Sequence, residues 1–246
     1  MFRHRDRART FKHNFRLAAF LSFTAGMVNI VGVLGLGVLT TNVTGHFAYF
    51  SEAVQKHDLS YAINLLFFII SFLLGAFISS CLSEYFILKE SRNAHHAAVF
   101  LELGILLSIG IWGERVISTG LHKELLACLR LFSMGSQNAL VTKISRATVR
   151  TTHLTGLFTD LGIELSQLIF YKEKRQMIQL KKSIGLRSGI ILFFFLGCIA
   201  GGYLYSLFAF KTLLIASVVL VIALIYDTAR VIYLKRIKTI KRGMLG

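Results

Sequence analysis

Long apolar stretches alternate with short polar and basic segments along most of this chain. About 20 helical residues cross a hydrocarbon core, and six stretches approach or exceed that length. This pattern predicts an all-α integral membrane protein with six transmembrane helices. The predicted spans are Leu17–Leu39, Tyr61–Leu88, Ala97–Trp112, Leu125–Val141, Ser188–Phe210 and Leu213–Leu234.

Composition agrees with this class, and the distribution of charge orients the chain. The 246 residues are 54% hydrophobic and 16% charged, and they include no proline. The net charge is +16, and most of the 28 Lys and Arg residues fall on the inner side if the amino terminus is cytoplasmic. We therefore expect both termini in the cytoplasm. Topology and attraction to anionic lipid headgroups explain the basic charge, so nucleic acid is not an expected partner.

An unusual polar phrase occurs twice. "TTNVTGHF" covers residues 40–47 and "TTHLTGLF" covers residues 151–158, while "GMVN" at 26–29 is matched by "GSQN" at 135–138. These echoes predict a duplicated unit in which a helix, a break, a shorter helical piece and two more helices follow one another. Because each unit holds three spans, an odd number, the second copy would be inverted in the membrane. We expect one membrane domain with repeats at 17–120 and 121–234, a basic arm at 1–16 and a basic tail at 235–246.

The pieces that follow each Thr-Gly pair, Gly45–Gln55 and Gly156–Tyr171, are predicted to be re-entrant or interfacial half-helices that enter from opposite sides. Irregular backbone inside a bilayer is tolerated only where it is buried in protein or lines a wet cavity. Threonine hydroxyls can cap such backbone or bind a ligand, the two glycines would permit a tight turn, and helix amino termini favour anions. The alternative is that the Thr-Gly pairs only let helices pack closely.

At these residues the chain resembles the YoaK family, through "AGMVN", "NVTGHF", "MGSQNA" and "TTHLTGLFTDLG". The resemblance covers the chain from Leu17 to Leu234. It implies a six-span protein of the bacterial inner membrane, sometimes suspected of transport, with no established substrate. Members often carry Asp where this chain has Asn29, which argues against a proton-carrying role there. They often carry Asn where this chain has His46, a group that could titrate near neutral pH.

Ionisable and amide side chains within the predicted spans are candidates for function, because they are costly in lipid. Arg130 could bind an anionic substrate or form an ion pair with Glu102 of the neighbouring span. Asp160 lies near the start of the second half-helix, where a carboxylate also complements the helix dipole. The predicted substrate-binding residues are Asn29, Thr41, Thr44, Gly45, His46, Arg130, Asn138, Thr152, Thr155, Gly156 and Asp160.

The sequence contains no catalytic set, phosphate-binding loop or metal-ligand cluster that we recognise, so we expect neither an enzyme nor a cofactor. The leading hypothesis is a small secondary transporter or permease for a polar or anionic small molecule. The alternative is a non-transporting scaffold or a protein that binds anionic lipid, for which the basic amphipathic segment Tyr171–Ser188 would suit the inner membrane surface. Small residues around Gly75 and Gly197 could pack within one chain or join two copies into a homo-oligomer.

Overall fold

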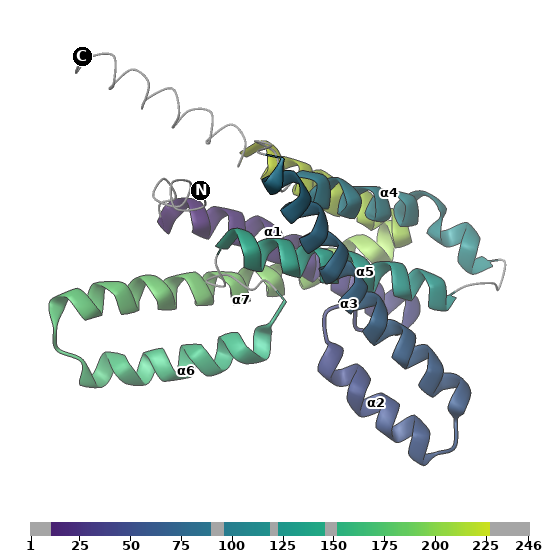
Figure 1. Ribbon diagram of the computed structural model, residues 1–246, viewed down its shortest axis with the longest axis horizontal. Coiled ribbons are helices and arrows are strands. Elements are labelled where there is room, and N and C mark those ends of the chain that lie inside the picture. The colour runs from purple at the N-terminus through teal and green to yellow at the C-terminus, as the bar shows by residue number, and fades with distance from the viewer. Residues whose placement is uncertain (1–10, 90–95, 119–122, 146–151, 227–246) are drawn as a thin grey trace.

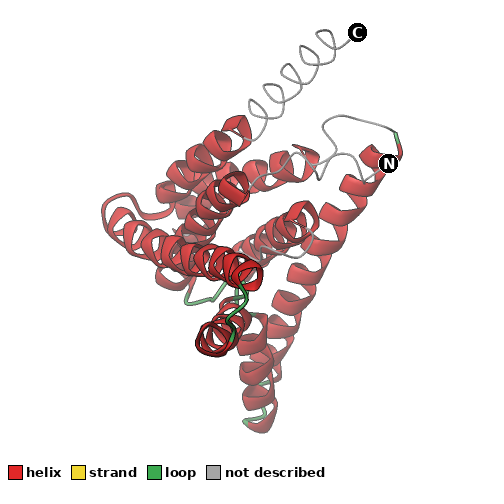
Figure 2. Ribbon diagram, turned by 90° about the vertical axis from the view of Figure 1, so that its left-hand side faces the viewer, coloured by secondary structure: helices red, strands yellow, loops and turns green. Residues whose placement is uncertain are grey.

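The computed structural model describes residues 11–89, 96–118, 123–145 and 152–226, and within them every regular element is a helix (Figures 1 and 2). The last described segment, 212–226, is also helical. The residues 1–10 of the predicted arm, the predicted tail at 235–246, and Thr151 of the second phrase lie outside the described residues. The elements are α1 (Phe11–Leu36), α2 (Val43–Gln55), α3 (Leu59–Leu88), α4 (His96–Ser118), α5 (Lys123–Ser145), α6 (Leu154–Phe170), α7 (Lys174–Phe208) and the short 3₁₀ turn η3 (Ala209–Lys211).

Four helical runs among the described residues are long and apolar enough to cross a membrane, which confirms an all-α membrane architecture. The last of these runs continues through α7, η3 and 212–226, so it includes the predicted span Ser188–Phe210 and the described part of the predicted span Leu213–Leu234. Helix α5 has 23 residues, but Lys123, Glu124, Arg130 and Lys143 make it more polar than the others. The runs are Phe15–Leu36, Leu59–Leu88, His96–Ser118 and Lys174–Tyr226.

Two helix crossings hold the bundle together, α1 against α7 and α3 against α5 (Figure 1). At the first crossing, a Cβ added to Gly26 would lie well inside 3.0 Å of the Phe194 carbonyl oxygen, and one added to Gly197 would meet the carbonyl oxygen of Phe23. The backbones therefore touch directly, as small residues allow in membrane helices. The thiol of Cys198 adds a hydrogen bond to the Gly26 carbonyl oxygen at 3.4 Å.

The second crossing repeats the first. A Cβ on Gly75 would collide with the Phe132 carbonyl oxygen, and one on Gly135 would collide with the carbonyl oxygen of Phe72. All four helices thus carry the same pattern, a phenylalanine followed three residues later by the contact glycine, written FTAG, FLLG, FSMG and FFLG. Small residues around Gly75 and Gly197 therefore pack within the chain.

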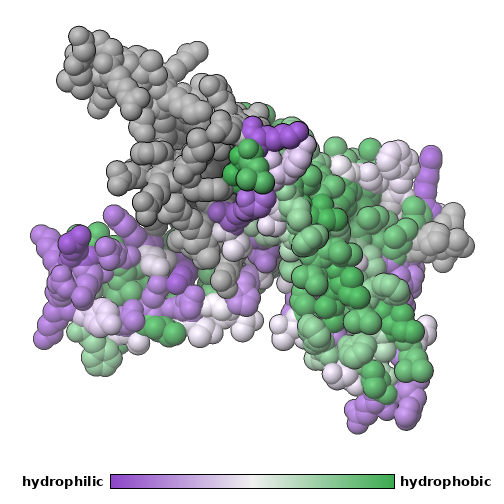
Figure 3. All heavy atoms as spheres, viewed as in Figure 1, coloured by the Kyte–Doolittle hydropathy of each residue, from purple (hydrophilic) through white to green (hydrophobic). Residues whose placement is uncertain are grey.

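The crossings pair helices from opposite halves of the sequence. The first helix of each half meets the third helix of the other half, while the short helix of each half packs on the long helix that follows it, α2 on α3 and α6 on α7. The duplicated sequence is therefore accompanied by duplicated packing. Around these contacts, large apolar side chains such as Leu73, Phe77 and Phe195 remain exposed, at 60% or more, and form a surface that lipid would cover (Figure 3).

Candidate functional site

The break after α1 is made by Gly37. This residue has φ of +70°, its amide donates to Val33 O at 3.0 Å, and the amide of Val38 donates to Gly32 O at 3.2 Å. This pair of bonds is the usual glycine ending of a helix, because glycine adopts the left-handed region without a steric penalty. The turn therefore lies several residues before Gly45, the glycine at which the sequence predicted a tight turn.

Asn29 anchors the first Thr-Gly element to α1. Its Oδ1 accepts hydrogen bonds from the Thr40 amide at 3.1 Å, the Thr41 hydroxyl at 3.1 Å and the Thr40 hydroxyl at 3.5 Å. The ring of His46, only 3% exposed, lies with Nε2 2.7 Å from the Leu39 carbonyl oxygen, an arrangement in which the nitrogen donates. The irregular backbone between α1 and α2 is thus satisfied inside the protein, as a bilayer requires.

Gly45 and Gly156 do not form the tight turns predicted for them, because both lie in the first turn of a helix. Gly45 donates its amide to Oδ1 of Asn42, the N-cap of α2, at 2.9 Å. A Cβ on Gly45 would lie 2.9 Å from Asn42 Nδ2, and one on Gly156 would overlap the ring of His153, the N-cap of α6. Each glycine therefore leaves room for the side chain of the N-cap residue.

The two short helices begin near the centre of the molecule and diverge outward from it (Figure 1). Thr44 and Thr155 occupy exposed positions in their first turns, whereas Thr152 is buried just before α6. The positive ends of both helix dipoles accordingly point inward. Thr44 and Thr155 lie on separate helix pairs, since α2 packs on α3 and α6 packs on α7.

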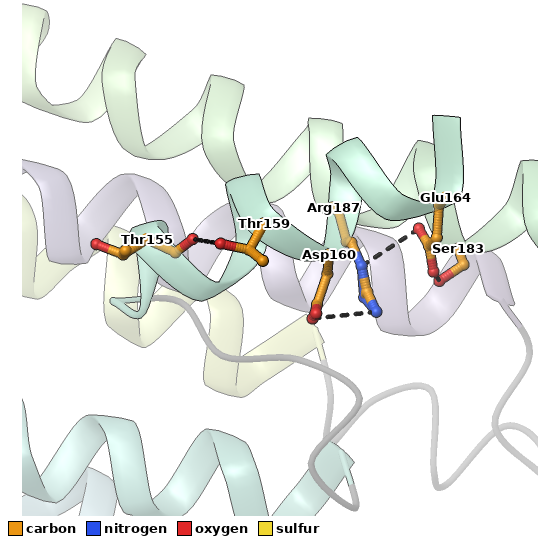
Figure 4. A network of polar contacts seen from close by, with 6 residues as sticks. All are labelled: Thr155, Thr159, Asp160, Glu164, Ser183 and Arg187. Carbon is orange, nitrogen blue, oxygen red and sulfur yellow. Dashed lines mark hydrogen bonds and ion pairs between the residues drawn. The ribbon is translucent and has the colours of Figure 1, made fainter. Parts of the chain in front are cut away.

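Asp160 is held by a network inside the α6–α7 hairpin (Figure 4). The guanidinium of Arg187 places Nη2 3.3 Å from Asp160 Oδ2 and Nε 3.3 Å from Glu164 Oε2. Ser183 donates its hydroxyl to the other oxygen of Glu164 at 2.6 Å. The carboxylate of Asp160 therefore already has a cationic partner on α7, which the sequence analysis did not identify because 26 residues separate the two.

Arg130 lies on α5 in the centre of the bundle and is fully buried. Its guanidinium carbon is 5.0 Å from the centre of the Phe210 ring, a cation–π contact with η3. Among the described residues, none of its three side-chain nitrogens has a hydrogen-bond partner. An ion in this position is costly, since its hydration has been lost and no carboxylate of the described residues pairs with it.

Glu102 on α4 is also fully buried, and neither of its carboxyl oxygens has a hydrogen-bond partner in the described part of the chain. The ion pair with Arg130 that the sequence allowed is therefore absent. Phe210 explains why, because it contacts Arg130 and would lie 3.2 Å from a Cβ on Gly113. Arg130 is thus level with Gly113, and Glu102 precedes Gly113 by eleven residues, about 16 Å along the helix.

Ser133 and Gln137 follow Arg130 at helical spacing on one face of α5. Both are fully buried, and the Ser133 hydroxyl and both amide atoms of Gln137 lack hydrogen-bond partners among the described residues. We call Arg130, Ser133 and Gln137 the polar column. The next residue, Asn138, is half-buried, and its Oδ1 likewise has no partner in the described ranges.

The polar column belongs to the second half of the chain alone. When the first FxxG motif (23–26) is aligned with the third (132–135), the positions that match the column are Leu21, Thr24 and Val28. Leu21 and Val28 are apolar, and the Thr24 hydroxyl bonds the Phe20 carbonyl oxygen of its own helix at 3.0 Å. The sequence analysis identified Arg130 but missed the serine and the glutamine, although the spacing R-x-x-S-x-x-x-Q would have revealed a shared face.

Comparison with known proteins identifies relatives of this chain. A family described as "Protein of unknown function (DUF1275)" matches residues 17–226. The UPF0700 transmembrane protein YoaK of Bacillus subtilis (strain 168) is 28% identical over 184 residues, which cover 74% of this chain and 80% of that protein. No solved structure matches the chain. Both sequence matches confirm the resemblance to YoaK, and because the family match extends over most of the chain, this membrane protein belongs to the DUF1275 family.

Proposed function

We propose that this protein is a small secondary transporter that moves a small anion across the bacterial inner membrane, with Arg130 as the anion-binding residue. The observation that carries the proposal is a fully buried guanidinium without a hydrogen-bond partner among the described residues. Ionisable groups inside membrane bundles are expensive, and they mark substrate or ion pathways. A bound anion would offset the cost of burying Arg130.

The geometry around Arg130 favours a planar carboxylate. Phe210 covers one face of the guanidinium, so the N–H groups at its edge are the available donors. A guanidinium presents these donors as a rigid fork that matches a carboxylate in a bidentate pair. One fixed positive charge suits a monoanion better than a multiply charged metabolite, since a second negative charge would enter the bundle without a partner.

The duplicated architecture supports a transport role. Many secondary transporters consist of inverted repeats with broken helices, whose half-helix amino termini point at an anionic group near the midplane. In our proposal the chain has six spans in two inverted halves, with both termini in the cytoplasm. Helices α2 and α6 are the re-entrant elements, and the inward direction of their amino termini adds positive potential to that of Arg130. Thr44 and Thr155 would then border the path.

The test is uptake of labelled anions into liposomes that contain the purified protein, with pyruvate and inorganic phosphate as probes. We expect uptake of pyruvate, reduced at least about 100-fold by Arg130→Gln, because one charge-assisted bidentate contact is worth about 3 kcal/mol. Arg130→Lys should restore only part of it, since an ammonium lacks the fork. The matched control is Arg115→Gln, which changes an exposed arginine of α4.

Folding must be measured in the same variants. Removing an unpaired buried charge is expected to leave stability unchanged or to raise it, because the cost of dehydrating that charge disappears. Arg130→Gln should therefore be at least as stable as the natural protein while it fails to transport. Full uptake by a folded Arg130→Gln protein would refute the assignment of Arg130 as the anion-binding residue.

A further inference from the structure

The polar column leaves Glu102 without a role, although this carboxyl group is as deeply buried as Arg130. The inference that follows rests on the proposed function. Arg130 and Glu102 are about 16 Å apart along the bundle axis, because Arg130 is level with Gly113 of α4. Glu102 lies six residues from the start of α4, and Arg130 lies seven residues from the start of α5. They therefore lie at different levels of the buried region.

Among the described residues, the elements packed on α4 offer no cation to Glu102. On α5, Lys143 places Nζ 2.7 Å from Glu84 of α3, so its charge is already paired. On η3, Lys211 is exposed, and in the segment 212–226 the buried side chains nearest this level are apolar. On α4 itself, the His96 ring lies against Phe100, with ring centres 6.5 Å apart. A carboxyl group in such surroundings is far less costly with its proton than without it.

The polar column extends from Arg130 toward the level of Glu102. Ser133 and Gln137 lie one and two turns beyond Arg130, on the side that leads toward the level of Glu102. Gln137 lies seven residues after Arg130 on α5, and Leu106 lies seven residues before Gly113 on α4. Because Arg130 and Gly113 share a level, Gln137 is level with Leu106, about one turn from Glu102. The partnerless hydroxyl and amide atoms of Ser133 and Gln137 are groups of the kind that buried water molecules bond to in proteins.

We propose that Glu102 carries a proton that is transported together with the anion bound at Arg130. The charges explain why the two would move together. Before loading, the positive charge of Arg130 and the negative charge of a deprotonated Glu102 attract one another through the low-dielectric interior. An anion bound at Arg130 cancels that attraction, so a deprotonated Glu102 becomes more costly and anion binding favours the protonated carboxyl group. With both substrates bound, neither buried charge is left without compensation, and one proton accompanies each anion.

Proteoliposomes separate this coupling from transport itself. With pyruvate as the probe, an inside-alkaline pH gradient should drive accumulation by the natural protein, and Glu102→Gln should abolish that accumulation. The same variant should keep pyruvate exchange across the membrane without a gradient, whereas Arg130→Gln should lose both activities. Glu102→Asp should recover gradient-driven accumulation. If Glu102→Gln accumulates pyruvate as the natural protein does, the proton role is wrong although transport stands.

A second measurement needs no substrate. Dicyclohexylcarbodiimide enters lipid and modifies protonated carboxyl groups, and mass spectrometry of peptides locates the product. We expect Glu102 to be labelled in membranes, more at pH 6 than at pH 9, while exposed Glu114 on the same helix serves as the control. Absent or pH-independent labelling of Glu102 would overturn the inference, even if pyruvate is not transported. Labelling that falls at high pH would support it independently of the uptake assay.

Discussion

A methyl group at a glycine crossing should destabilise the fold in a defined way. In Gly26→Ala, the new Cβ would lie inside 3.0 Å of the Phe194 carbonyl oxygen, a backbone atom that no rotamer change can move. Helices α1 and α7 would have to separate by up to roughly 1 Å to restore normal contact, and this would loosen the dispersion contacts along the crossing. The exposed Gly104 of α4 has no neighbouring atom within 4 Å of an added Cβ and serves as the control.

The magnitude follows from two opposing terms. Overpacking a well-packed helix contact costs about 1–3 kcal/mol, and replacing a helical glycine with alanine contributes about 1 kcal/mol of stability in return. For Gly26→Ala, the free energy of unfolding is therefore expected to fall by at most about 2 kcal/mol. Gly104→Ala should instead gain up to about 1 kcal/mol, because only the second term applies.

The assay is unfolding of the purified protein in mixed micelles with increasing dodecyl sulfate, followed through the fluorescence of Trp112, the single tryptophan. Double variants add a second check. Gly26→Ala with Gly197→Ala changes one crossing twice and should cost less than the sum, since the helices have already separated. Gly26→Ala with Gly75→Ala changes both crossings and should add within about 0.5 kcal/mol. Stability of Gly26→Ala equal to that of Gly104→Ala would refute the direct backbone contact.

Two further predictions concern polar networks. Asn29→Ala should lower the free energy of unfolding by about 2–3 kcal/mol in the same assay, because the Thr40 amide and two threonine hydroxyls lose their acceptor, whereas Asn29→Asp should retain most of the stability, since Oδ1 only accepts. Equal losses in both variants would contradict this account. Arg187→Gln should raise hydrogen exchange in α6 and leave α3 and α5 unchanged, because Asp160 and Glu164 lose their partner on α7. Unchanged exchange in α6 would show that the network does not hold the hairpin.

Much of the architecture follows from local pattern. Apolar length predicts the long helices, and the repeated phrase predicts the two short ones, which begin at Val43 and Leu154, each two residues before the predicted start. The span count of six was not confirmed. Arg130 and other polar residues make α5 less hydrophobic than a membrane span is expected to be, although the helix is long enough to cross a membrane. The exchange of helices between the halves could not be predicted, since it depends on contacts between residues more than 50 positions apart.

The site was harder to predict than the fold. Arg130 was visible as a charge within an apolar span, but the absence of its pairing with Glu102 depends on the relative register of α4 and α5, which a single sequence does not contain. Gly45 was assigned to a turn because the helix break was placed at Thr-Gly and glycine permits a tight turn, whereas the glycine that turns the chain is Gly37, in the less polar stretch before it. Asp160 was assigned to substrate without knowledge of Arg187, its partner on the neighbouring helix.

The exchanged crossings bear on the origin of the chain. Because α1 packs on α7 and α5 packs on α3, a single four-helix half would leave both of its glycine faces uncovered. Such a half could bury them only by pairing with a second copy, and the result would be an intertwined homodimer with the same two contacts. Gene duplication and fusion would turn that dimer into one polypeptide. It would also free one half to change independently, so that a buried arginine could arise where the other half keeps leucine.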